Sequence, residues 1–234
     1  MKLLRLGAVG ALALGIAAAP VSSARAQIVW TGWTAFTAGQ TTGTATGTIG
    51  STTVTYVGEV GAGSLVNTPV VNPPNTGLWR ELSPPLAYGG IGPKTNDFIQ
   101  LSGGTGTGTN TLSFSAPVDN VFLAIISLGQ PGLPAQFNFD HAFTINSQGA
   151  GNFGGSATSL TATGNTLFGT EGNGVLQFTG PITSISWTNP VHEFYYGFTV
   201  GAAGGTSTIP EPSSLGLLAS GLVGLAPIVR RRRR

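Results

Sequence analysis

The chain has 234 residues and no cysteine, and its formal net charge of +2 comes from its two ends. Residues 27–209 hold two basic and seven acidic residues, so no basic patch is available for nucleic-acid binding. The missing cysteines exclude disulfides and thiolate chemistry. The 37 glycines and abundant threonine disfavour a helical bundle.

The first 26 residues predict a secretory signal peptide. Two basic residues near the start are followed by an apolar run over residues 6–19, which is short for a membrane span. Ala24 and Ala26 supply the small-x-small pattern of a cleavage site, with Gln27 as the new N-terminus. The mature protein is therefore expected to be exported.

Residues 27–201 predict one all-β domain, a single jelly-roll-like β-sandwich. Short apolar runs alternate with Gly, Pro, Asn and Thr at intervals of about ten residues, which is typical of sandwiches and barrels. The segment 121–126 is apolar on both faces, so it should run through the middle of the domain. The expected strands are Val29–Phe36, Thr52–Val60, Phe98–Leu101, Thr111–Ser115, Asn120–Ser127, Ala142–Asn146, Gly174–Phe178, Ser184–Thr188 and Phe194–Val200.

Two segments of the body carry special patterns. Residues 67–93 contain too many prolines for a strand ladder and predict a long loop pinned by Leu78, Trp79 and Leu86. In residues 41–55 threonines alternate, as on ice-binding surfaces. Such surfaces need many registered repeats, so this single short run predicts an ordinary exposed strand face.

Aromatic side chains are the candidates for sugar contact, because sugars stack on flat apolar rings. Trp79, Tyr195 and Tyr196 are the available platforms, and Trp79 in the proline-rich loop is expected to be the more exposed. Trp187 shares a face with Ile185 and is expected in the core.

No catalytic residue is predicted, since the sequence contains neither Gly-x-Ser-x-Gly nor His-Glu-x-x-His. The scattered acids show no recognisable pair for glycoside hydrolysis. No cofactor is predicted apart from a structural calcium ion, which needs only oxygen ligands. Asp119, Asp140 and Glu193 are its candidate ligands.

The C-terminus has three parts behind a flexible linker over residues 202–209. Pro210, Glu211 and Pro212 come first, followed by a charge-free run from Ser213 to Val229. A helix of that length just reaches across a hydrocarbon core. Five arginines then hold its far end on the cytoplasmic side. These are Arg230, Arg231, Arg232, Arg233 and Arg234.

This tail over residues 210–234 resembles the PEP-CTERM sorting signal of Gram-negative bacteria. The resemblance implies that an exosortase, a membrane cysteine peptidase, recognises and cuts the protein near Pro210–Pro212. The precursor would be held transiently in the inner membrane and then released or transferred to the cell surface or extracellular matrix. A plain C-terminal anchor that is never cut is the alternative.

Together these patterns predict an exported, non-enzymatic protein of the cell surface or extracellular matrix, associated with exopolysaccharide and biofilm. Its partners would be the exosortase and extracellular polysaccharide. One alternative is a carbohydrate-binding module, which could depend on calcium. A second is an extracellular enzyme that acts on polysaccharide.

Overall fold

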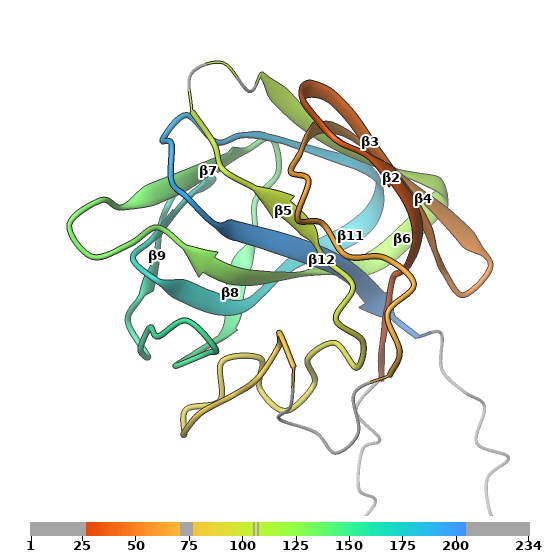
Figure 1. The fold of residues 1–234 in the computed structure, drawn as a ribbon. Helices are drawn as coiled ribbons and strands as arrows, with labels where there is room; N and C mark the ends of the chain where they lie inside the picture. Colours follow the sequence, from red (N-terminus) through yellow and green to blue (C-terminus); the bar gives the residue numbers. More distant parts are fainter. Residues whose placement is uncertain (1–26, 71–76, 105, 107, 205–234) are drawn as a thin grey trace, which may run out of the picture.

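The structure is a computed structural model that describes residues 27–70, 77–104, 106 and 108–204 (Figure 1). Within them the chain is all β, and its strands form one antiparallel hydrogen-bonded network. The all-β prediction is therefore confirmed, while the jelly-roll-like sandwich stays a prediction. The strands are β1 (Ile28–Trp30), β2 (Gly32–Thr37), β3 (Gly39–Ile49), β4 (Thr52–Val60), β5 (Ile99–Leu101), β6 (Thr109–Leu128), β7 (Ala135–Phe139), β8 (Thr144–Gln148), β9 (Leu160–Thr163), β10 (Thr166–Gly169), β11 (Gly172–Thr188) and β12 (Tyr196–Ala203).

Two predicted membrane-related segments, the signal peptide over residues 1–26 and the helix in the sorting tail, lie outside the described residues. Among the residues that are described, no helix is long and apolar enough to cross a membrane.

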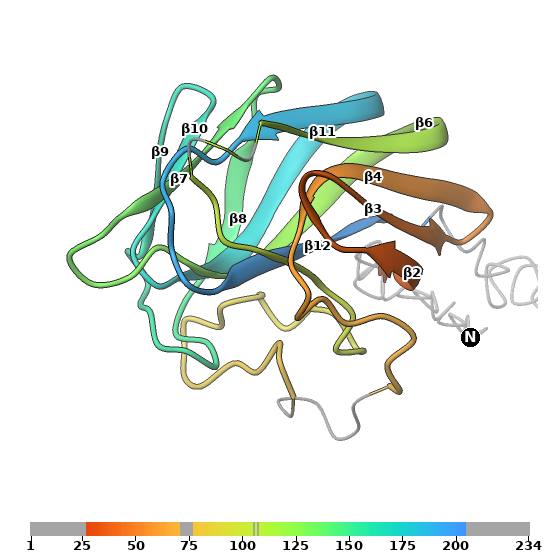
Figure 2. The same cartoon turned by 45° about the horizontal axis from the view of Figure 1, so that its top comes forward.

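Two long strands, β6 and β11, pair with each other and connect all the others. The first half of β6 pairs with β4, which leads to β3 and β2, whereas the second half pairs with β12. Likewise β11 pairs with β8 near its start and with β7 near its end. Both strands bend where Asp119 faces Pro181 beside a register shift, and Figure 2 shows them curving together.

The main core is built around an aromatic cluster. Trp187 is 1% exposed, as predicted, and its ring centroid lies 5.7 Å from that of Tyr56 and 5.2 Å from that of Phe198. The segment 121–126 is buried on both faces, which confirms its predicted central position. Its alternate residues contribute to the main core and to a second apolar cluster.

The second cluster lies beneath the proline-rich loop. Trp79 and Tyr88 of this loop pack edge to face at 5.4 Å, in one cluster with Phe122 and Val175. Trp79 thus pins the loop as predicted. Its expected exposure is wrong, because only 5% of Trp79 is exposed. The loop is drawn in yellow below β8 in Figure 1.

Strand boundaries differ from the expected ones in two ways. The expected strands on either side of each bend are continuous, so that β6 and β11 each absorb two of them. The structure also contains β7, β9 and β10, none of which was expected, and β3, which holds the threonine run predicted to be an exposed strand face. β3 is rich in Gly and Thr, and its Gly43 and Gly47 are needed because a Cβ there would collide with Val60 and with the backbone of Gly32.

The two ends of the described domain lie side by side. β1 pairs with the end of β12, with Ile28 opposite Ala203, and the Gly204 N–H donates to the Gln27 carbonyl at 2.7 Å. β12 therefore continues to Ala203 and takes up the first two residues of the predicted linker. The rest of that linker lies outside the described residues.

Replacing Phe198 with Ala should lower the free energy of unfolding by about 3–5 kcal/mol, because the ring is fully buried and its loss leaves a cavity. Phe194→Ala is the matched control, since Phe194 is 79% exposed and its loss should change stability by less than about 0.5 kcal/mol. Denaturant titration followed by tryptophan fluorescence measures both. Equal effects would contradict the core described above.

Candidate functional site

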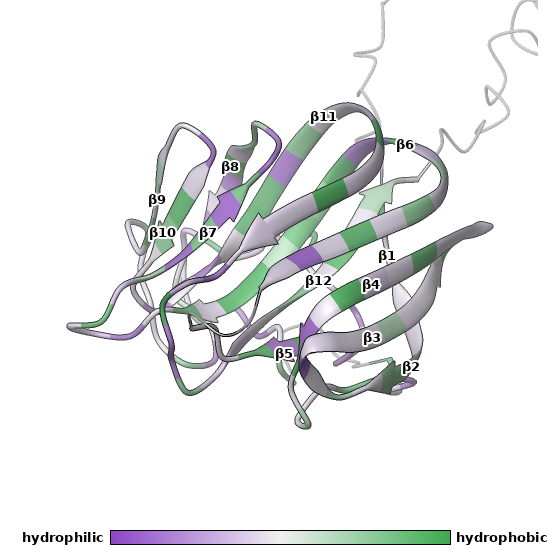
Figure 3. Cartoon of the chain, turned by 90° about the horizontal axis from the view of Figure 1, so that it is seen from above, coloured by the Kyte–Doolittle hydropathy of each residue, from purple (hydrophilic) through white to green (hydrophobic). Residues whose placement is uncertain are grey.

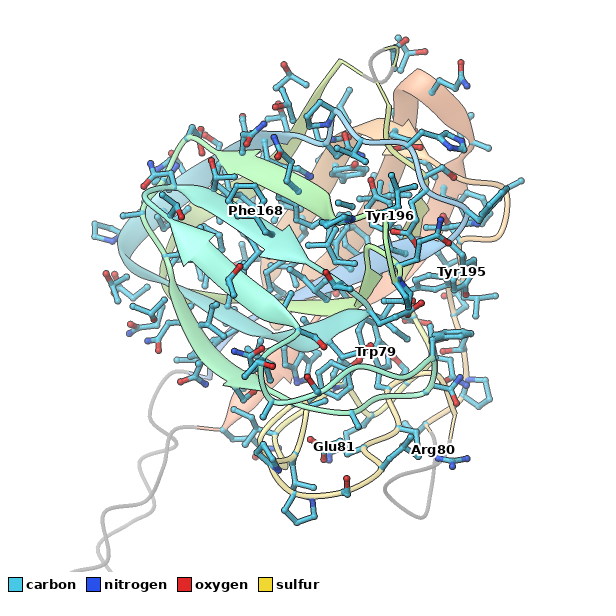
Figure 4. The ribbon with its side chains drawn as sticks, turned by 90° about the vertical axis from the view of Figure 1, so that its left-hand side faces the viewer. Trp79, Arg80, Glu81, Phe168, Tyr195 and Tyr196 are labelled. Carbon is cyan, nitrogen blue, oxygen red and sulfur yellow. The ribbon has the colours of Figure 1, made fainter. Side chains whose placement is uncertain are left out.

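The loops before β12 and after β6 meet at the end of the domain opposite its termini, which we call the distal end. β12 has eight residues, so its first residue lies roughly 25 Å from its last. The Gly129 N–H, just after β6, donates to Glu193 Oε2 at 2.8 Å. The Glu193 N–H in turn donates to the Ser102 carbonyl at 2.7 Å. Figure 4 shows Tyr195 and Tyr196 in this region, above Trp79.

Glu59 is a buried carboxylate near the end of β4, with 5% exposure. It accepts hydrogen bonds from the N–H groups of Ser102 at 2.8 Å and of Gly103 at 3.0 Å. Asn189 Nδ2 donates to its second oxygen at 2.7 Å. A buried charge is tolerated only when several donors compensate for its lost hydration. Glu59 therefore ties β4 to both loops that flank it.

Asn110 and two buried tyrosines extend this network. Asn110 Oδ1 accepts from the Tyr56 hydroxyl at 2.6 Å and from the Glu59 N–H at 2.9 Å, and its Nδ2 donates to Asn189 Oδ1 at 2.9 Å. Asn189 Nδ2 also donates to the Tyr196 hydroxyl at 3.0 Å. Burial raises the pKa of both tyrosines, so their hydroxyls stay protonated. The network acts as a structural clamp.

Gly103 lets the two loops of the clamp approach each other. Its φ of 70° lies in the left-handed region, and a Cβ there would collide with the Val191 carbonyl and the Tyr196 hydroxyl. Gly103 therefore marks a close crossing of two loops.

Glu193 and Glu171 place two interacting carboxyl groups beside the clamp. Glu193 is 4% exposed, and the half-buried Glu171 accepts from the Ser127 hydroxyl at 2.7 Å. Burial raises the pKa of Glu193 to about 7. The N–H groups of Gly129 and Tyr195 oppose this rise, while the negative charge of Glu171 adds to it. The Glu193 carboxyl group therefore changes its protonation state near neutral pH.

Two aromatic residues, Phe194 and Tyr195, directly follow Glu193 in the chain. Phe153 is 43% exposed, and its ring centroid lies 5.2 Å from that of the half-buried Tyr195, which rests on Phe98 at 5.8 Å. Phe194 is 79% exposed and lies 6.2 Å from His192. Exposed rings next to hydrogen-bond acceptors are the combination that binds sugars, because the rings take the apolar faces and the acceptors take the hydroxyls.

Of the three predicted sugar-contact residues, only Tyr195 reaches this surface. Trp79 lies in the second apolar cluster, and Tyr196 is fully buried with its hydroxyl in the clamp. Neither ring is available for stacking, which corrects the expectation for both.

The three predicted calcium ligands lie apart. Asp119 is at the bend of β6, and Asp140 follows β7, where it accepts from the Ser186 N–H at 2.9 Å and contacts His141. Glu193 is at the distal end. Within the described ranges, no group of three or more His, Asp or Glu residues is arranged to hold a metal ion.

A groove of about 580 Å³ lies at the end of the domain that carries the termini. Asp119 and Asn120 line it together with Val29 and Ala202. Asp119 therefore belongs to this groove rather than to the distal end.

Five residues of this site were not predicted from the sequence: Glu59, Asn110, Asn189, Glu171 and Phe153. Alternation along β4 places Glu59 with the outward Thr55 and Val57, so the sequence pattern did not predict its burial. No local pattern marks the others, because their partners come from segments far along the chain.

Comparison with known proteins bears on the C-terminus. A family model described as the PEP-CTERM protein-sorting motif matches residues 208–234. The chain carries a PEP-CTERM sorting motif. The match contains both Pro210–Pro212 and the arginine cluster, which lie outside the described residues. No curated protein and no solved structure matches the chain.

Glu193 should make stability depend on pH. Between about pH 4.5 and pH 7 the folded protein keeps a proton on Glu193 that the unfolded chain has lost, so this contribution to stability falls as the pH rises. Glu193→Gln keeps an acceptor for the N–H groups and removes the titration. Its melting temperature should therefore fall less than that of the wild type from about pH 5 to pH 8. If the melting temperatures of both proteins fell equally over this pH range in thermal scans, the raised pKa of Glu193 would be contradicted.

Proposed function

We propose that this protein is a non-enzymatic component of the cell surface or extracellular polysaccharide matrix, and that its β domain makes the adhesive contacts there. The PEP-CTERM motif carries the proposal, because it implies an exported protein whose membrane-anchored precursor is sorted by an exosortase. A sorting tail of this kind serves a domain that acts outside the cell.

The arrangement of the domain supports the same proposal. Gln27 and Gly204 meet at one end of the domain. The chain continues from Gly204 toward the sorting tail, so the tail is attached at that end. The distal end, with its exposed rings, then faces away from the membrane while the precursor is anchored. Adhesion through that end or through one sheet face needs no catalytic group.

A second candidate function is a carbohydrate-binding module at the distal end. Its support is the pairing of Phe153 with Tyr195 at 5.2 Å, with the exposed Phe194 next to Tyr195 in the chain. Calcium dependence stays part of this candidate, although Asp119 and Asp140 would not contribute to a site there.

A polysaccharide-acting enzyme has less support. Glycoside hydrolysis needs two carboxyl groups flanking a bond in a cleft. Glu193 has the raised pKa of a general acid, but it is 4% exposed and holds the Gly129 N–H. A carboxyl group in that position orders the loop rather than facing a substrate.

Replacing Arg230–Arg234 with Ser, or Glu211 with Ala, should leave the uncut precursor in the inner membrane. The basic cluster sets the orientation of the helix, and Glu211 lies in the motif that the peptidase is expected to recognise. Membrane fractionation and the mass of the secreted protein measure the outcome. Unchanged mature mass and secretion in both variants would overturn the sorting role.

Phe153→Ala combined with Phe194→Ala should weaken binding to the producing cell's own exopolysaccharide about tenfold, or about 1.4 kcal/mol, if the distal rings bind sugar. Val70→Ala with Leu82→Ala is the matched control, because both residues are exposed and apolar but lie in the long loop. Pull-downs with calcium and with EDTA measure binding. Equal losses in the two double variants would exclude the distal site.

A further inference from the structure

One face of the sheet is covered by hydroxyl side chains over four adjacent strands. We call it the hydroxyl face, and define it by the outward residues of β3, β4, the first part of β6 and the last part of β11. Along each strand exposed or half-buried hydroxyl residues alternate with buried ones, such as Ala45, Val54, Leu112 and Ile185. Figure 3 shows these four strands side by side.

The hydroxyl residues are in register across the strands. In a first row Thr46 pairs with Thr55, Thr55 with Ser113, and Ser113 with Ser184. A second row runs parallel to it through Thr44, Val57, Thr111 and Ser186. Thr48 and Thr53 form a third row, which continues to Ser115 because its hydroxyl accepts from the Thr53 N–H at 2.9 Å. The short threonine run of the sequence is therefore one column of a two-dimensional array.

A fourth row extends the array to the far edge of the sheet. Thr109 pairs with Thr188, Thr188 with Asn138, Asn138 with Thr166, and Thr166 with Thr163. Asn138 links its neighbours, since its Nδ2 donates to Thr188 and its Oδ1 accepts from Thr166, both at 3.1 Å. Neutral hydrogen-bonding groups thus continue over β7, β10 and β9.

The hydroxyl face carries one charged group, at its edge: Asp140, which follows β7, accepts a hydrogen bond from the Ser186 N–H at 2.9 Å and contacts His141. Among the described strand residues of β3, β4, β7, β9 and β10, and of the parts of β6 and β11 named above, only Glu59 is charged, and it is buried. Exposed strand faces usually gain solubility from Lys and Glu, so a wide face built mainly from hydroxyls, with one carboxylate at its edge, fits a partner that is itself uncharged and rich in hydroxyls.

We propose that the hydroxyl face binds an uncharged polysaccharide chain. Each hydroxyl can donate or accept, so it can meet a sugar hydroxyl in either orientation. The array repeats about every 4.8 Å across the strands and about every 6.6 Å along them, which offers a chain many weak contacts at once. Val57, 44% exposed among the hydroxyls, provides an apolar spot for the face of a sugar ring. This inference rests on the proposed function and names its partner.

A flexible chain suits this face better than a rigid lattice. Neighbouring strands rotate by roughly 20–25° relative to one another, so four strands cannot keep the hydroxyls in one plane. An ice surface would match only part of the array. A single polysaccharide chain can follow the twist. An acidic polysaccharide would find no cation on the face to pair with.

The test uses the full chain, purified in mild detergent, and two probes, the neutral hydroxyethylcellulose and the acidic alginate, in affinity electrophoresis at low and high salt. Thr46→Val, Thr55→Val, Ser113→Ala and Ser184→Ala together remove the first row. The matched control removes two threonine and two serine hydroxyls elsewhere, through Thr158→Val, Thr170→Val, Ser51→Ala and Ser83→Ala.

We expect hydroxyethylcellulose to retard the wild type and the control equally, with little effect of salt, and the row variant to lose about tenfold in affinity. No retardation of the wild type, equal loss in both variants, or preference for alginate would overturn the proposal. So would ice shaping that is lost in the row variant without any polysaccharide binding. Because the purified chain is tested, a failure here is distinct from a failure to reach the cell surface.

Discussion

The pairing of β6 with β11 is the constraint on which the rest of the domain depends. These two strands run together through both halves of the sheet, and every other strand attaches to one of them directly or through a neighbour. Their shared bend requires facing irregularities, with Asn120 and Gly180 both at positive φ. A change that straightened one strand would break register with the other, and so would displace the core and the hydroxyl face together.

The domain has few charged residues, and each buried carboxylate needs hydrogen-bond donors around it. Glu59, Asp97 and Glu193 are all 5% exposed or less, and each accepts backbone N–H groups from a different segment of the chain. Buried carboxylates therefore replace the salt bridges that usually join loops. Where burial outweighs the donated hydrogen bonds, the pKa of the carboxyl group rises, as at Glu193.

Much of the fold follows from local pattern, whereas the candidate site does not. Alternation alone locates β4 and the core position of Trp187, and the apolar segment 121–126 identifies the central strand. In β3 the alternating threonines predict an exposed strand face, whereas the close packing of Gly43 and Gly47 appears only in the folded chain. For Trp79 the expected exposure is wrong, since a proline-rich loop can itself cover a sheet face. The distal site joins segments far apart in sequence, and no local pattern records such a meeting.

The distribution of charge also bears on how the domain meets a matrix. Residues 27–209 hold seven acids and two basic residues, and the three buried acids still contribute to the field around the domain. Such an excess of acids gives acidic polymers no attraction at a distance. Contact must then come from many short-range hydrogen bonds and a few exposed rings, which act only when partner and surface touch. Such contacts are weakly screened by salt, which suits a protein that works outside the cell, where ionic strength varies.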